Sequence, residues 1–169
     1  FDQPDLKAQF SLELTLPASW MAMSNGPLTA ETTYEDRKVQ RFEMKQPIST
    51  YLFAFTAGRF DSISAERDGR SMRMFHREPD DKKILRNAGI IFDQHARALK
   101  WLEEYTGIPY PFDKLDMVLL PGFQYSGMEH PGAIWYRDSR LLLDEQAPMN
   151  MQLSRASLIA HETAHMWFG

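Results

Sequence analysis

The first part of the chain alternates between hydrophobic and polar positions with the period of β-strands. Residues 10–16 alternate strictly, which predicts a half-buried strand that Pro17 ends. Residues 32–44 mix β-branched, aromatic and charged side chains, as an exposed pair of strands does. Residues 50–57 are apolar on both faces and predict an interior strand, and residues 71–76 predict one more. None of these segments carries a catalytic constellation, so we expect them to be structural.

A helical period replaces this alternation after Pro79. Asp80 or Asp81 can cap the helix, and Gly107 is placed to end it, with two prolines soon after. The apolar positions of this segment recur at helical spacing and are Ile84, Leu85, Ala88, Ile91, Phe92, His95, Leu99 and Leu102. We interpret His95, on this apolar face, as a packing residue rather than a metal ligand.

The rest of the chain combines two short strands with a second helix. Residues 115–120 and 133–136 are predicted strands, and residues 138–147 form a charged connector. Residues 149–169 are rich in Leu, Ala, Met, Gln and Arg, which predicts a helix that reaches the last residue.

Composition narrows the classes of function. Hydrophobic residues make up 43% of the chain and aromatic residues 12%, which is enough for a sizeable core. The net charge of −4 and the pI near 5.7 argue against a nucleic-acid partner. Cysteine is absent, which excludes a disulfide framework and a thiolate metal site and leaves the redox compartment open. No apolar run approaches the length of a membrane span, so we expect none here.

The segment with the clearest chemistry is His161-Glu162-Thr163-Ala164-His165. Four residues of helix advance about 6 Å and rotate about 400°, so the two histidines emerge within roughly 40° of each other. Their ring nitrogens can therefore bind one tetrahedral zinc ion, and Glu162 can take a proton from a water molecule that the metal activates. This pattern arises by chance in about one chain in a hundred of this size and composition. The alternative is a surface helix with two solvated histidines.

A second candidate segment surrounds Glu129. Gly127 and Gly132 flank this carboxylate, which is typical of backbone that approaches another chain closely, as a ligand-binding edge strand does. The alternative is an ordinary glycine-rich loop with a solvated Glu129. The spacing alone favours that alternative.

Together these segments resemble the aminopeptidase N and leukotriene hydrolase family of zinc metallopeptidases, which are gluzincins. That family has Gly-x-Met-Glu-Asn on a strand and His-Glu-x-x-His on a helix about thirty residues later, and Glu129 and His161 are so placed. Residues 1–8 resemble the end of the family's N-terminal β domain, and residues 110–116 resemble the entry to its catalytic domain.

The resemblance implies an α+β fold with parts of two domains and one metal site. Residues 1–77 would be the C-terminal part of a saddle-like, antiparallel N-terminal β domain. Residues 78–169 would be the N-terminal part of a thermolysin-like zinc peptidase domain. His161 and His165 would bind one Zn²⁺ ion, and Glu162 would be the general base that passes the proton to the leaving amine.

The resemblance also implies how a peptide with a free N-terminus would bind. Glu129 would hold the α-ammonium group of the first residue, which limits cleavage to one residue from the N-terminus. The backbone at Gly127 and Met128 would run alongside the substrate, and Met128 would border the first side-chain pocket. The chain departs from the family pattern at His130, where Asn is usual, and at Ser126, where Gly is common.

The family's third zinc ligand is a Glu about eighteen residues past the second histidine, and a Tyr that steadies the oxyanion follows it. Both positions would lie beyond Gly169. We therefore expect the chain to be an internal fragment of a longer zinc aminopeptidase, inactive without the remainder of its parent chain. The alternatives are a zinc endopeptidase, which shares the helix motif, and a non-catalytic peptide- or protein-binding module.

Overall fold

The computed structural model describes residues 3–169, so Phe1 and Asp2, at the start of the family-like opening segment, lie outside the described residues. The chain divides into two compact units. Unit 1 comprises Phe1–Phe60, Phe112–Leu115 and His130–Ala133, and unit 2 comprises Asp61–Pro111, Asp116–Glu129 and Ile134–Gly169. The predicted domain boundary after residue 77 stays a prediction.

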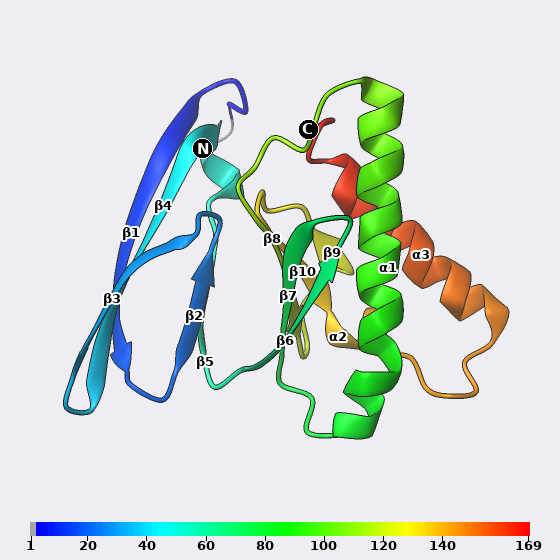
Figure 1. The fold of residues 1–169 in the computed structure, drawn as a ribbon, viewed down its shortest axis with the longest axis horizontal. Helices are drawn as coiled ribbons and strands as arrows, with labels where there is room; N and C mark the ends of the chain where they lie inside the picture. Colours follow the sequence, from blue (N-terminus) through cyan, green and yellow to red (C-terminus); the bar gives the residue numbers. More distant parts are fainter. Residues whose placement is uncertain (1–2) are drawn as a thin grey trace. The chain divides into compact units, whose positions relative to one another are not determined.

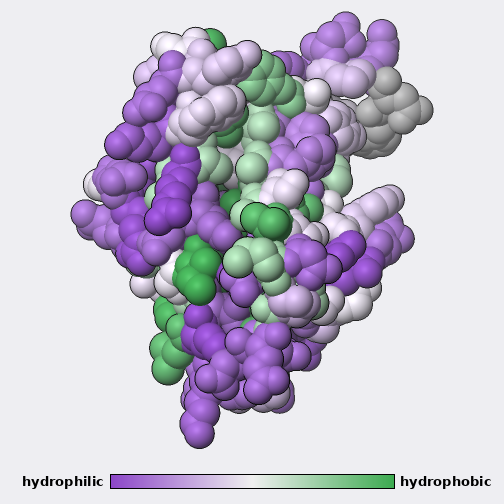
Figure 2. All heavy atoms as spheres, turned by 90° about the vertical axis from the view of Figure 1, so that its right-hand side faces the viewer, coloured by the Kyte–Doolittle hydropathy of each residue, from purple (hydrophilic) through white to green (hydrophobic). Residues whose placement is uncertain are grey.

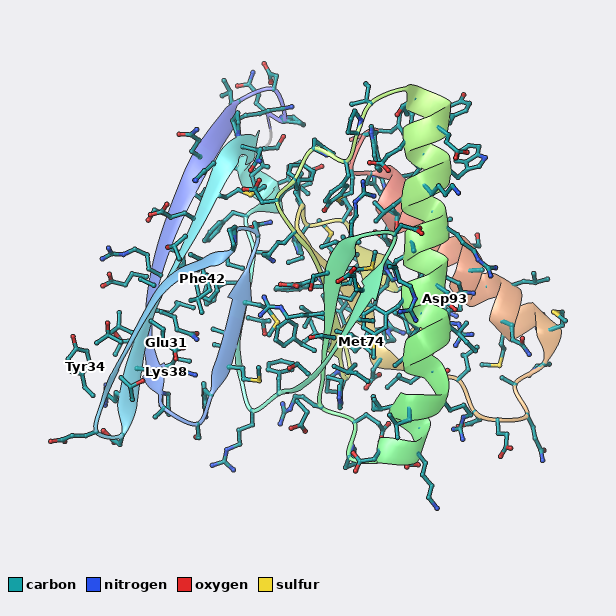
Figure 3. All side chains as sticks on the ribbon, viewed as in Figure 1. Glu31, Tyr34, Lys38, Phe42, Met74 and Asp93 are labelled. Carbon is teal, nitrogen blue, oxygen red and sulfur yellow. The ribbon has the colours of Figure 1, made fainter. Side chains whose placement is uncertain are left out.

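Unit 1 is built from antiparallel strands. Strands β1 (Lys7–Pro17), β4 (Arg37–Ser49) and β3 (Leu28–Tyr34) form one sheet in the order β1-β4-β3 (Figure 1). Lys38 of β4 pairs with Glu31 of β3 at 3.7 Å (Figure 3). Strand β2 (Met21–Ser24) pairs with β5 (Phe55–Gly58) in a separate two-stranded sheet. The alternation at residues 10–16 therefore predicted β1 correctly.

The interior strand predicted for residues 50–57 is wrong. Its first residues form a 3₁₀ turn, η1 (Thr50–Leu52), and only Phe55–Gly58 is a strand. Phe53 lies between them and stacks on Phe10 of β1 with ring centroids 4.7 Å apart. Of residues 50–57 only Ala54 is buried, so the apolar run does not mark an interior strand.

Unit 2 contains nearly all of a five-stranded sheet in the order β6-β7-β8-β10-β9. These strands are β6 (Asp61–Arg67), β7 (Arg70–His76), β8 (Leu115–Leu120), β10 (Ala133–Arg137) and β9 (Gly127–Met128). The first residues of β8 and β10 belong to unit 1. Strand β6 was missed from the sequence, because its small polar and charged residues give no hydrophobic run. The fully buried Met74 of β7 is part of the core (Figure 3).

Helix α1 (Asp81–Thr106) lies alongside this sheet (Figure 1). Asp80 caps it by accepting hydrogen bonds from the backbone of Lys82 and Lys83, and Gly107 ends it in the left-handed conformation. Asp93 of α1 accepts a hydrogen bond from Arg67 of β6 at 2.7 Å (Figure 3). Both predicted helix ends are confirmed.

The last elements are α2 (Asp138–Leu141), within the predicted connector, and α3 (Met149–Ala164), which packs against α1. Figure 2 shows the side of the molecule that carries α3, where hydrophobic side chains lie among hydrophilic ones. The exposed apolar residues of α3 include Met149, Met151 and Leu153. Helices beside mainly antiparallel strands confirm the α+β class. Within residues 3–169, no helix combines the length and apolar character that crossing a membrane requires.

Candidate functional site

The two histidines of the HExxH pattern lie at the C-terminal end of α3. Their Nε2 atoms are 3.3 Å apart, and their rings meet edge to face with centroids 4.7 Å apart. Two nitrogen ligands at about 2.0 to 2.1 Å from a tetrahedral zinc ion lie about 3.3 to 3.4 Å from each other. The histidine pair therefore has the separation that one zinc ion requires.

The predicted helix does not reach Gly169, because α3 ends at Ala164 and His165 is its C-cap residue. The chain continues in a turn in which the backbone N–H groups of Trp167 and Phe168 both donate to the carbonyl of Ala164. His165 Nδ1 donates to the carbonyl of Phe168 at 3.0 Å. A carbonyl can only accept, so this bond places the proton of a neutral ring on Nδ1 and leaves Nε2 free to bind a metal.

Glu162 lies on the buried side of the same helix and is 5% exposed. Burial, together with the nearby charge of Glu129, raises the pKa of Glu162 to about 7, although His165 acts in the opposite direction. Potential ligand atoms of Glu129, Glu162 and His165 all lie within 4.8 Å of one another. The structure thus brings the predicted carboxylates to His165, although Glu129 lies more than thirty residues earlier in the chain.

Gly127 and Met128 form β9, the last strand in the sheet order. They pair with Tyr136 and Trp135 of β10, and no strand pairs with the other side of β9 within residues 3–169. Gly127 lies directly against Glu162, because a Cβ atom there would be 2.6 Å from Cγ of that glutamate. The close approach inferred from Gly127 is therefore made by this chain's own α3.

The two departures from the family pattern lie in different units. His130 belongs to unit 1, where its buried ring has Nδ1 3.2 Å from the carbonyl of Leu52. Gly132, also in unit 1, has a φ of +75° and lies against the backbone of Asn25. Ser126, in unit 2, accepts a backbone hydrogen bond from Arg137 at 3.0 Å. His130 is not one of the residues gathered around His165.

Sequence reasoning missed Tyr136, which pairs with Gly127 and supports the site. Tyr136, fully buried on β10, has its hydroxyl 3.0 Å from Nε2 of His95, whose Nδ1 is 2.8 Å from the carbonyl of Ile91. Burial, with a smaller contribution from the charge of Glu162, raises the pKa of Tyr136. His95 is thus a fully bonded packing residue, as predicted. Only its place on an apolar helix face pointed to it, and nothing in the sequence pointed to Tyr136 as its partner.

Comparisons with known proteins point to the same family in both the first and the last part of the chain. Residues 90–169 match the Peptidase family M1 domain, and residues 1–52 match the Peptidase M1 N-terminal domain. The chain is 34% identical over 173 residues to Aminopeptidase M1 of Arabidopsis thaliana, an alignment that covers all of this chain and 19% of that protein. It is 34% identical to human Endoplasmic reticulum aminopeptidase 1 and to human Glutamyl aminopeptidase, covering all of this chain and 18% of each. The chain thus spans about a fifth of the length of these relatives.

Proposed function

Because the chain belongs to peptidase family M1, we propose that it is part of a zinc-dependent aminopeptidase that removes N-terminal residues from peptides. The observation that carries the proposal is the pair of Nε2 atoms 3.3 Å apart, with the carboxylates of Glu129 and Glu162 grouped around His165. The relatives named above are aminopeptidases by name, which supports the same reaction class.

The donor set fits zinc. Neutral imidazole is a preferred zinc ligand, and the His165 tautomer fixed by Phe168 presents the unprotonated Nε2 that ligation needs. His161 and His165 would be two of three protein ligands, and we expect the third, a Glu, in the part of the protein that follows Gly169. When bound, the ion would lower the pKa of a water molecule and polarise the peptide carbonyl.

Glu162 is placed to act as the general base. Its carboxylate is buried and lies close to His165. Glu162 would take the proton from the attacking water and deliver it to the amine that leaves. The close packing of Gly127 on its side chain restricts the positions that this carboxylate can adopt.

Glu129 would select substrates with a free N-terminus. Its carboxylate lies near both Glu162 and His165, so an α-ammonium group held there would place the first peptide bond beside the base. The unpaired side of β9, at Gly127 and Met128, would bind the substrate backbone as an added strand. An internal peptide segment has no cation to offer to Glu129, so we expect exopeptidase rather than endopeptidase cleavage.

The full-length protein tests this proposal. Purified protein should contain about one zinc ion per chain by elemental analysis and should release the amino acid from an aminoacyl-coumarin substrate. Glu162→Gln should retain the zinc and lose nearly all turnover, because Gln can bind water but cannot accept its proton. Protein that binds no zinc, or an E162Q variant that stays active, would contradict the proposal. A non-catalytic binding module would bind no zinc, so protein without zinc would favour that alternative.

A further inference from the structure

His165 differs from His161 in how its orientation is fixed. His161 lies within α3, whereas His165 is the residue at which α3 ends. The helix hydrogen-bond ladder therefore constrains the backbone of His165 on one side only. The bond from its Nδ1 to the carbonyl of Phe168 supplies the rest of the constraint. That constraint is only as rigid as the turn that holds the carbonyl in place.

The turn is fastened to the segment that follows α1. Trp167, immediately before Phe168, donates from its indole Nε1 to the carbonyl of Ile108 at 2.9 Å. Its ring also lies 5.9 Å, centroid to centroid, from that of Tyr110. Met166 is buried, and its sulfur is 4.0 Å from the hydroxyl of Tyr110. Both residues between His165 and Phe168 therefore contact residues 108–110.

Residues 108–110 are themselves held by several bonds. Glu103 accepts hydrogen bonds from the backbone N–H of Tyr110 at 2.7 Å and from Arg70 of β7 at 2.6 Å. Thr106 accepts a hydrogen bond from the backbone N–H of Ile108 at 3.1 Å. A continuous series of contacts thus runs from the sheet, through the end of α1, to the turn that orients His165.

We propose that Trp167 is a positioning residue for the metal site: its indole N–H anchors the turn that presents the Phe168 carbonyl to His165. This inference rests on the proposed function, since it concerns the zinc ligand named there. The group acts on the metal through two intermediates, the turn and the ligand. Loss of a group that bonds a metal ligand directly, as the Phe168 carbonyl would, typically changes metal affinity about 10- to 100-fold, so we expect the lower end of this range for the residue that anchors that carbonyl.

The test is Trp167→Phe in the full-length protein, because phenylalanine keeps an aromatic ring against Tyr110 and removes only the donor. Zinc affinity is measured by competition with a chelator, and ligand geometry by the visible absorption of the Co²⁺-substituted protein. We expect about tenfold weaker zinc binding and a changed cobalt spectrum, with an unchanged circular-dichroism spectrum of the apo-protein. Trp20→Phe, at a partly exposed tryptophan of unit 1, is the matched control and should change neither quantity.

The possible outcomes separate the two proposals. Wild-type protein that binds no zinc would overturn the proposed function. Wild-type protein that binds zinc, with a W167F variant of equal affinity and an identical cobalt spectrum, would overturn the positioning role alone. If W167F does not fold, Glu103→Ala replaces it, because this change releases Tyr110 without touching the turn. We then expect zinc affinity to fall about threefold or more, and an unchanged affinity would refute the inference.

Discussion

Replacing Glu129 by Gln in the full-length protein would test what separates an aminopeptidase from an endopeptidase. Glutamine keeps the size of the side chain and one acceptor oxygen but removes the negative charge that would pair with a peptide's α-ammonium group. We therefore expect the loss to fall on substrates with a free amine, and to arise from the missing charge rather than from a rearranged site.

The burial of Glu129 determines how large a loss in kcat/KM we expect. Losing one member of a desolvated, hydrogen-bonded charge pair costs about 2 to 5 kcal/mol. Glu129 is only partly buried, so water screens the pair and the lower end applies. About 2 to 3 kcal/mol corresponds to roughly 30- to 150-fold in kcat/KM. We expect this reduction for a leucyl-coumarin substrate in the E129Q variant.

The assay compares free and N-acetylated leucyl-coumarin in the wild type, in E129Q and in Glu145→Gln. Glu145 is an exposed acid between α2 and α3, so its replacement changes the net charge equally without touching the site. Wild type should cleave only the free amine, and E145Q should match it. The reasoning is refuted if E129Q keeps at least a third of the wild-type kcat/KM, or if wild type cleaves the acetylated substrate. Cleavage of the acetylated substrate would favour a zinc endopeptidase.

Three further predictions concern the stability of unit 2, measured as its unfolding transition in the full-length protein. Asn87→Leu should destabilise unit 2 by about 3 to 5 kcal/mol. Buried Asn87 bonds the backbone N–H and C=O of Leu143 and the buried guanidinium of Arg155, and all three groups would lose this partner. An effect below about 1 kcal/mol would contradict this prediction. The pKa of buried His95 is lowered from 6.5 to about 4 by burial, so the unfolded state binds more protons between these values and stability falls as pH falls. The free energy of unfolding should fall by about 2 kcal/mol between pH 7.5 and pH 5, and this pH-dependent loss should be absent in the H95Q variant. Gly89→Ala, within α1 and with no atom within 4 Å of the added Cβ, should stabilise by about 0.5 to 1 kcal/mol, and a lower unfolding temperature would refute this.

Several features of the fold and the site could be predicted because local sequence determines them. The spacing of His161 and His165 places both rings on one side of a helix whatever surrounds it. Asp80 and Gly107 mark the ends of α1, because a side-chain cap and a left-handed residue are local features. The motifs also predicted the family correctly, and residues 1–52 and 90–169 match an M1 N-terminal domain and an M1 domain in that order.

Features that depend on tertiary contacts could not be predicted in this way. Helix propensity extended the last helix to Gly169, whereas the indole of Trp167 bonds to Ile108, 59 residues away, and the helix ends at Ala164. The apolar run at residues 50–57 predicted a buried strand, but Tyr51 and Phe55 are exposed and Phe53 packs by stacking on the ring of Phe10. The spacing of residues around Glu129 favoured a solvated loop, because nothing local shows that β9 lies against α3.

Helix α1 carries none of the candidate site residues, but it contacts α3 directly and is bonded to β10, the strand that pairs with β9. Near its middle, His95 bonds Tyr136 of β10, the residue paired with Gly127 of the candidate substrate strand. Just past its end, Ile108 accepts the hydrogen bond that fastens the turn following the HExxH helix. The relative position of Glu129 and His165 is therefore held by contacts with α1 and its end as well as by the direct packing of β9 on α3. The caps that fix the ends of α1 therefore help to position the site as well as to stabilise the fold.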